Sequence, residues 1–150
     1  EEPIPVLTPF NLLPIWTGEL PAPIVDRLVQ HLMDPDTFGG PYPIPTVARN
    51  DPHYDPERMW RGPVWANINY FFIEALEKVG EGELANFLMV QTLDMIAAHQ
   101  DIYEYYNADT GEPPPKAANI FGWTASVFID LAVRASMVAE RQGGSVQYAE

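Results

Sequence analysis

Apolar residues recur at intervals of three and four positions in four segments of the chain, which is the spacing of an α-helix with one buried face. These segments are residues 22–33, 63–79, 82–99 and 121–141. In the third segment the apolar stripe consists of Leu84, Phe87, Leu88, Val90, Leu93 and Ile96. The pattern therefore predicts four amphipathic helices that pack on one another.

Proline and glycine mark the ends of these predicted helices. Pro21 and Pro23 open the first helix, and Pro63 suits the first helical position of the second. A tight Gly-Glu-Gly turn at residues 80–82 joins the second helix to the third. Because so short a turn reverses the direction of the chain, we expect these two helices to form an antiparallel hairpin.

Two long connections, residues 34–62 and 101–120, hold most of the aromatic and charged residues outside the helices. Long irregular loops in a compact domain usually carry function. Prolines, of which the chain has 16, stiffen such loops. Short connections at one end and long ones at the other are typical of an α/α toroid, whose long loops surround a central cleft. We therefore predict an all-α fold of this kind.

The chain is strongly acidic, with 21 acidic and 8 basic residues and a net charge of −13. This charge repels nucleic-acid backbones and anionic lipid surfaces, so we expect neither as a partner. No apolar run reaches the roughly 20 residues that span a bilayer. The acidic start, residues 1–3, also differs from the basic start of a signal peptide. We therefore expect a cytoplasmic protein that binds a small, uncharged or locally cation-assisted ligand.

Metal and thiol chemistry find little support in the sequence. The chain has no cysteine, which removes disulfides, thiol nucleophiles and cysteine metal ligands. His31, His53 and His99 are scattered and lack the paired spacing of a zinc site. We therefore expect neither a metal nor a cofactor.

Glu104 lies in the run Ile-Tyr-Glu-Tyr-Tyr-Asn, residues 102–107, among three aromatic rings. Rings and carboxylates together are what glycosidic chemistry uses. Neighbouring tyrosine hydroxyls and the Asn107 amide can bind the carboxylate oxygens and fix their direction. A solvated acid on a strand edge, with the rings turned inward, explains the pattern equally well. The residues alone leave both interpretations open.

A second aromatic run, Trp-Arg-Gly-Pro-Val-Trp, precedes the second predicted helix. The spacing of Trp60 and Trp65 places one on the loop and the other one turn into the helix, and sugar stacking and core packing suit them equally. Arg61 is better explained by hydrogen bonds to loop carbonyls. Gly62 permits a close backbone approach or an unusual φ. Trp123 opens the fourth helix, where core packing is favoured over capping a cleft.

Five motifs in this order resemble a known group of enzymes. They are residues 13–16 (Leu-Pro-Ile-Trp), 38–45, 60–67, 103–111 and 121–125. The group is that of the inverting α-glycosidases with an (α/α)6 barrel, which includes processing α-glucosidase I, family 63 glycoside hydrolases, mannosylglycerate and glucosylglycerate hydrolases and, more distantly, trehalases. The resemblance covers most of the chain.

The resemblance implies a role for each candidate residue. Glu104 matches the general base that activates the hydrolytic water, and Trp60 and Trp65 match tryptophans that line the subsites near the scissile bond. The remaining candidates for substrate contact are Arg61, Gly62, Tyr103, Tyr106 and Trp123. The implied ligand is a small α-glucoside or α-mannoside, or an oligosaccharide.

Two departures from the family pattern stand out. Met59 occupies a position where the family commonly has an aromatic residue, which bears on recognition of the leaving group. The general acid of the family is an aspartate in an earlier Trp-Asp motif, and the chain contains no such motif. We therefore expect the general acid to lie outside this sequence.

The predicted helices are too few for the six helical hairpins of a complete barrel. We interpret residues 1–150 as the C-terminal portion of a catalytic domain, with an N-terminal remainder or a second copy of the chain as its partner, and expect this portion alone to be inactive. Two alternatives remain. One is a non-catalytic carbohydrate-binding helical domain; the other is a different α/α-toroid sugar enzyme, such as an epimerase or a debranching-type glucosidase.

Overall fold

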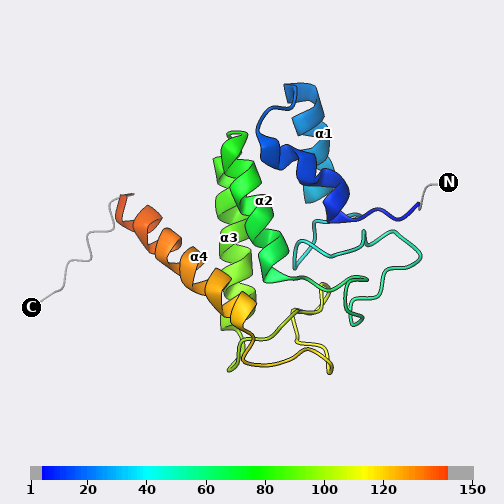
Figure 1. The fold of residues 1–150 in the computed structure, drawn as a ribbon, viewed down its shortest axis with the longest axis vertical. Helices are drawn as coiled ribbons and strands as arrows, with labels where there is room; N and C mark the ends of the chain where they lie inside the picture. The colour runs from blue at the N-terminus through cyan, green and yellow to red at the C-terminus, as the bar shows by residue number, and fades with distance from the viewer. Residues whose placement is uncertain (1–4, 142–150) are drawn as a thin grey trace, which may run out of the picture.

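A computed structural model describes residues 5–141, and the regular structure of this part is entirely helical (Figure 1). The elements are a 3-10 helix η1 (Pro9–Thr17) followed by the α-helices α1 (Ala22–Met33), α2 (Ala66–Lys78), α3 (Gly82–Ala97) and α4 (Gly122–Arg141). All four predicted helices are therefore confirmed, and the predicted all-α class with them.

The predicted helix ends need correction at four points, one of which is the end of the second helix, at Lys78 and not at Val79. The second helix begins at Ala66 and not at Pro63, because the backbone of Val64 is extended and paired with Tyr106. Trp65 is consequently the N-cap of α2 and does not lie one turn inside it. The third helix ends at Ala97, two residues before the predicted end at His99. The fourth begins one residue later than predicted, at Gly122.

The 3-10 helix η1 was not predicted. Pro14 lies inside it, and a proline within a short apolar run counts against a helix. A capping box forms its start, where the Asn11 Oδ1 accepts a hydrogen bond from the Thr8 backbone N–H at 2.9 Å. Gly18, with φ at +73°, ends it. Leu12 and Ile15 are buried where η1 packs on α2.

The α2–α3 hairpin forms the centre of the fold, and α4 packs against both of its helices. Arg134 of α4 binds Glu74 at 2.7 Å and Glu77 at 2.6 Å on α2, so two ion pairs link these helices. Inside the hairpin, Asn69 is fully buried and has three partners: it accepts from Ile44 N and donates to Pro43 O and Thr92 Oγ1. This buried amide ties the first long loop to both helices.

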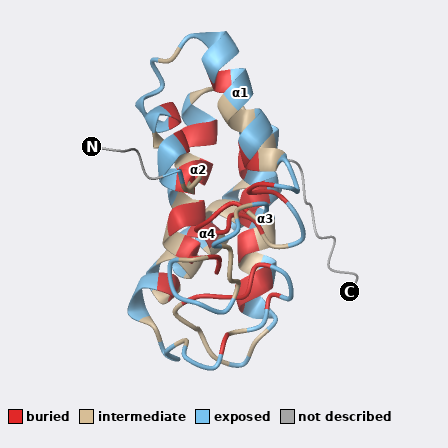
Figure 2. Cartoon of the chain, turned by 90° about the vertical axis from the view of Figure 1, so that its right-hand side faces the viewer, coloured by how far each residue is buried: buried red, intermediate tan, exposed pale blue. Residues whose placement is uncertain are grey.

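Both long loops lie at one end of the hairpin, where α2 begins and α3 ends, as predicted for a toroid (Figure 1). Figure 2 shows that buried stretches of the chain continue from the helices into these loops. An isolated antiparallel bridge joins the two loops at Val64–Tyr106, and two further bridges, Pro45–Val64 and Tyr103–Asn119, each lie within one loop. The loops therefore form a packed layer against the helix ends.

One face of α4 exposes apolar side chains. Ile129, Val133 and Met137 recur every four residues and so share that face, and all three are exposed. Within residues 5–141, no other element covers this stripe. The same part of the chain contains no helix that is both long and apolar enough to cross a membrane.

Candidate functional site

Aromatic rings from three separate motifs stack on one another beside the start of α2. Trp60 lies parallel to Trp65, with 4.0 Å between the ring centroids and 14° between the planes. On Trp65 a second ring, Tyr105, stacks at 5.3 Å. Phe121 meets the edge of Trp65 at 6.4 Å and in turn contacts Trp123, also at 6.4 Å. The structure thus places the motif of Trp60 and Trp65 against two others that lie about forty to sixty residues later in the chain.

The three tryptophans of this cluster differ in exposure. Trp65 is 3% exposed and belongs to the core, whereas Trp60 is 40% and Trp123 59% exposed. The preference for core packing of Trp123 is therefore wrong for this chain, because most of its ring faces solvent. Trp65 forms a buried floor, and the two exposed rings present apolar surface above and beside it.

Trp60 has an unusual backbone. Its φ is +60°, in the left-handed region that residues with a side chain rarely adopt. Such strain costs on the order of 1–3 kcal/mol and collects at functional sites. Next to it, the Trp65 Nε1 donor is buried and has no hydrogen-bond partner among the described residues. The strained backbone of Trp60 and the unpaired indole N–H of Trp65 both reduce stability. Two such costs at one place favour a functional role.

The residues between the two tryptophans hold the loop. A Cβ on Gly62 would lie 2.5 Å from the Asp55 carbonyl oxygen, so the predicted close backbone approach is confirmed. The backbone of Arg61 accepts from Asp55 N and donates to Arg58 O, both at 2.9 Å. In residues 5–141 its guanidinium makes no hydrogen bond or ion pair, so the predicted bonds from this side chain to loop carbonyls are wrong. The backbone of Arg61 makes the loop bonds instead.

Glu104 is held in place through its main chain. Its N–H donates to Ala118 O at 2.8 Å, and its carbonyl accepts from Thr124 Oγ1 at 3.5 Å. The segment just after it is anchored by Tyr106, whose backbone exchanges two hydrogen bonds with Val64, at 2.8 and 3.0 Å. The position of Glu104 is therefore fixed from both sides of the loop.

The side-chain partners predicted for Glu104 bind elsewhere. The Tyr106 hydroxyl accepts from Tyr103 N at 3.0 Å, and the Asn107 Oδ1 accepts from Asp109 N at 2.9 Å. Within the described residues, no group donates a hydrogen bond to the Glu104 carboxylate. Burial, and secondly the charge of Glu104, raise the pKa of the Tyr105 hydroxyl. The negative charge of Glu104 therefore affects Tyr105, one ring of the stack, while the carboxylate oxygens stay available for other partners.

Tyr103 and Tyr106 support the loop in different ways. Tyr106 is fully buried and stacks on His99 at 5.6 Å, and burial raises the pKa of its hydroxyl. Tyr103 is half-buried and meets His99 edge-on at 6.1 Å. Both stay predictions as substrate contacts, and in this chain the ring of Tyr106 reaches no surface.

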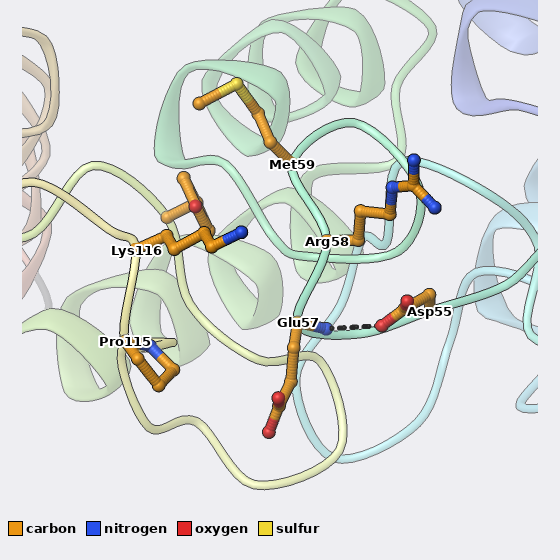
Figure 3. Close-up of a pocket in the computed structure, with 7 residues that line it drawn as sticks. Asp55, Glu57, Arg58, Met59, Pro115 and Lys116 are labelled. Carbon is orange, nitrogen blue, oxygen red and sulfur yellow. Dashed lines mark hydrogen bonds between the residues drawn. The ribbon is translucent and has the colours of Figure 1, made fainter.

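A cavity of about 620 Å³ lies beside the aromatic stack (Figure 3). It is lined by residues of both long loops: Asp55, Glu57, Arg58, Met59, Tyr105, Pro115 and Lys116. Figure 3 shows the Asp55 carboxylate accepting from the Glu57 N–H, at 3.1 Å, so this acid serves the local turn. The sequence did not point to most of these residues, because residues 55–58 and 115–116 carry no motif and no periodic pattern. Met59 and Tyr105 were the exceptions, because they lie next to or within the two aromatic motifs.

The histidines do not converge. His53 pairs with Asp51 at 2.9 Å, and the His99 Nε2 lies 2.9 Å from Gly111 O, while His31 is exposed on α1. In the part of the chain that the structure describes, no group of three or more His, Asp or Glu residues is arranged to hold a metal ion.

Comparison with known proteins identifies the family. The sequence profile described as "Mannosylglycerate hydrolase MGH1-like glycoside hydrolase domain" matches residues 1–124. The chain belongs to the MGH1-like glycoside hydrolase family. The match includes the run with Trp60 and Trp65, Glu104, and Trp123, so the residues of the aromatic cluster lie within the family's own domain.

Characterised relatives of this MGH1-like chain are considerably longer. It is 31% identical over 127 residues to mannosylglycerate hydrolase MGH1 of Selaginella moellendorffii, covering 83% of this chain and 25% of the relative. It is 30% identical over 128 residues to the mannosylglycerate hydrolase of Thermus thermophilus, covering 84% and 29%. The chain thus spans about a quarter of the length of these relatives.

Solved structures confirm the predicted fold class. The MGH1-like chain superposes on a GH63 mannosylglycerate hydrolase from Thermus thermophilus, in complex with Tris and D-glycerate, with a TM-score of 0.78 and 29% identity. The superposition covers 89% of this chain and 31% of that enzyme. The architecture is therefore part of an (α/α)6 barrel, as predicted.

The different roles of the two stacked tryptophans can be tested by measuring the free energy of unfolding. In the full-length protein, Trp65→Ala should lower the free energy of unfolding by about 3–5 kcal/mol, as for other buried aromatic residues. Trp60→Ala should cost only about 1–2 kcal/mol, since its ring is 40% exposed. Chemical denaturation measures both. Equal losses would contradict the assignment of Trp65 to the floor and Trp60 to the exposed surface.

Proposed function

We propose that the full-length protein is an inverting α-glycosidase in which Glu104 is the general base. The observation that carries this proposal is that Glu104 adjoins Tyr105, the ring stacked on Trp65, and that its carboxylate accepts no hydrogen bond within the described residues. Aromatic faces suit the apolar faces of a sugar ring. Membership of a glycoside hydrolase family supports the reaction class.

The inverting reaction uses two carboxyl groups about 6.5–9.5 Å apart, with a water between the base and the anomeric carbon. Glu104 accepts a proton from this water as the water oxygen bonds to the anomeric carbon. At the same time the bond from that carbon to the glycosidic oxygen breaks, and the oxygen takes a proton from the general acid. A base without other hydrogen bonds fits this role, because its oxygens stay free for the water.

The substrate we propose is a small α-mannoside or α-glucoside. The relatives are named mannosylglycerate hydrolases, and one solved relative is in complex with D-glycerate. In this chain Arg58 and Lys116 line the cavity beside the stack, and neither is ion-paired within residues 5–141. These two cations are suited to an aglycone that carries a carboxylate. Met59 lies in the same wall and shapes the space left for it.

The general acid must come from outside this chain, in an N-terminal remainder that completes the barrel. Two features support this assignment. The chain spans about a quarter of the length of its curated relatives, and the exposed stripe of Ile129, Val133 and Met137 lacks a cover in the described part. An apolar helix face of this kind is normally buried against another element.

Replacing the base tests the proposed chemistry. In the full-length protein, Glu104→Gln should lower kcat by about 100- to 10,000-fold, because an amide keeps the shape but accepts no proton from water. Binding of the substrate should change little. Glu112→Gln, an exposed acid on the same loop, is the matched control and should leave kcat unchanged.

Three other outcomes of that experiment are informative. Near-normal turnover of Glu104→Gln would remove this residue from the mechanism. Sugar binding without hydrolysis in the unmodified full-length protein would instead favour the non-catalytic carbohydrate-binding domain. Activity only towards the branch points of a glucan would favour a debranching-type glucosidase.

The isolated chain should be inactive. Residues 1–150 expressed alone lack the general acid and expose the α4 stripe, so we expect no hydrolysis and a tendency to self-associate, measured by light scattering. Replacing Ile129, Val133 and Met137 together by Gln should reduce that self-association. A stable monomer that hydrolyses an α-glucoside unaided would contradict the expectation, because the acid would then have to lie within this chain.

A further inference from the structure

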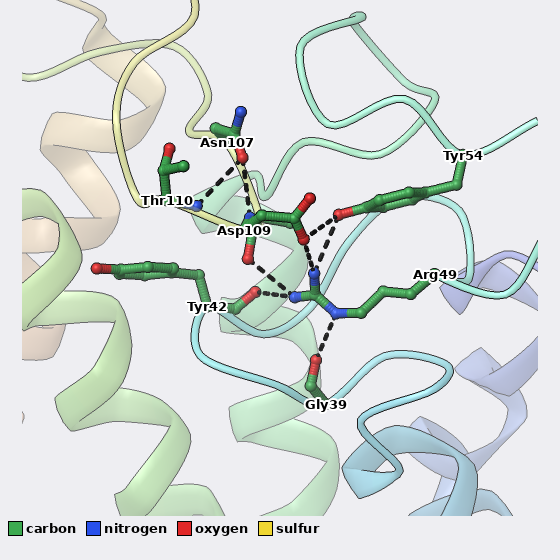
Figure 4. Close-up of polar contacts among 8 residues, drawn as sticks. Gly39, Tyr42, Arg49, Tyr54, Asn107, Asp109 and Thr110 are labelled. Carbon is green, nitrogen blue, oxygen red and sulfur yellow. Dashed lines mark hydrogen bonds and ion pairs between the residues drawn. The ribbon is translucent and has the colours of Figure 1, made fainter.

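Arg49 joins the two long loops through all of its side-chain donors (Figure 4). A guanidinium carries five N–H groups in a fixed plane. Each has an acceptor here, and the acceptors are Gly39 O (2.8 Å), Tyr42 O (3.0 Å), the Tyr54 hydroxyl (3.0 Å), Ala108 O (3.0 Å) and the Asp109 carboxylate. Three of these acceptors lie on the loop of Arg49 itself, and two lie about sixty residues away on the loop of Glu104.

The residues around Arg49 bury its side chain and hydrogen-bond to it. Its side chain is only 12% exposed. The Tyr54 hydroxyl accepts from Arg49 and donates to Asp109 at 2.8 Å, which closes a three-membered network. Burial, and then the hydrogen bond to Asp109, raise the pKa of Tyr54, so this hydroxyl keeps its proton and remains a donor.

Two glycines leave room where the loops meet. Gly40 has φ at +101°, and a Cβ there would lie 3.0 Å from the Arg49 Nε. Gly111 has φ at +76°, and a Cβ there would lie 2.5 Å from the ring of Tyr42. Side chains at these positions would push the loops apart. The backbone of both loops is therefore shaped around the guanidinium and around the contact of Tyr42 with Gly111.

The turn that Arg49 binds, residues 107–110, begins three residues after Glu104. The buried Asn107 Oδ1 accepts from Asp109 N at 2.9 Å and from Thr110 N at 3.2 Å, which makes residues 107–110 a compact unit. Before this unit, the Tyr106–Val64 backbone pair makes a separate contact to the loop of Trp60. Arg49 thus supplies the second anchor of the Glu104 segment, on the far side of that pair.

We propose that Arg49 is a positioning residue for catalysis. By hydrogen-bonding to the 107–110 turn, it fixes the position of Glu104 relative to the Trp60–Trp65 stack. This inference rests on the proposed role of Glu104 as base. The bonds of Glu104 to Ala118 and Thr124 stay within its own loop and α4, so the contacts to the first loop set its direction relative to Trp60. Arg49 supplies two of these contacts, to Ala108 and Asp109, beyond the Val64–Tyr106 pair. A general base must meet its water with an accuracy that small rotations destroy.

The test compares Arg49→Lys with the unmodified full-length protein. Lysine keeps the charge, but its three N–H groups radiate from one atom and cannot span acceptors on both loops. We expect kcat to fall by about 10- to 100-fold, since misplacement of about 1 Å can cost that much. KM should stay within about threefold, because the aromatic stack that binds the sugar is unchanged.

A matched control separates positioning from general destabilisation. Arg134 also forms ion pairs, with Glu74 and Glu77, but on the outer face of α2 and α4. Arg134→Lys should leave kcat unchanged even if its melting temperature falls as far as that of Arg49→Lys. Substrate binding adds a second readout: in a Glu104→Gln background, introducing Arg49→Lys should leave the Kd unchanged, since positioning of the base does not contribute to ground-state binding.

The outcomes distinguish this inference from the proposed function. If Arg49→Lys keeps normal kcat while Glu104→Gln is inactive, the positioning role is refuted and the base assignment stands. If Glu104→Gln is active, the proposed function fails first. A rise in KM at constant kcat would also overturn the inference. If Arg49→Lys does not fold, Asp109→Asn replaces it, because Asp109 is half-exposed and the substitution is milder. A several-fold loss of kcat in that variant supports the proposal, and a normal kcat overturns it.

Discussion

The backbone pair between Val64 and Tyr106 is the contact on which the rest of the site depends. Each residue donates its N–H to the carbonyl of the other, at 2.8 and 3.0 Å, and both side chains are fully buried. Val64 also bridges to Pro45, so one residue joins three stretches of irregular chain. Buried backbone groups need such partners, and without them a packed layer of loops would be unstable.

This pairing sets the register of the neighbouring residues. Trp65 follows Val64 and Tyr105 precedes Tyr106, so an antiparallel pair places these two rings side by side, where they stack at 5.3 Å. Trp60 then covers Trp65, and Glu104 lies one position beyond Tyr105. The order of residues in two short motifs, combined with one backbone pair, therefore accounts for the stacked aromatic rings and for the position of Glu104 next to Tyr105 in the chain.

Periodicity predicted the four α-helices, because each has a continuous apolar face, and the aromatic motifs pointed to Trp60, Trp65 and Glu104. What the sequence did not predict depends on contacts between distant residues. Trp65 became a cap because Val64 is paired with a loop forty residues away. Asn107, expected to bind Glu104, caps a turn instead. Arg49 has no neighbouring motif, and its five acceptors converge only in the folded chain.

In the proposed mechanism Glu104 directs a water to the face of the sugar opposite the leaving group. The configuration of the first-formed product reports this directly. Proton NMR of the full-length protein with an α-linked substrate, recorded before mutarotation, should show the β-anomer of the released sugar first. Initial formation of the α-anomer would mean retention through a covalent intermediate, and would contradict the role of Glu104 as a general base for water.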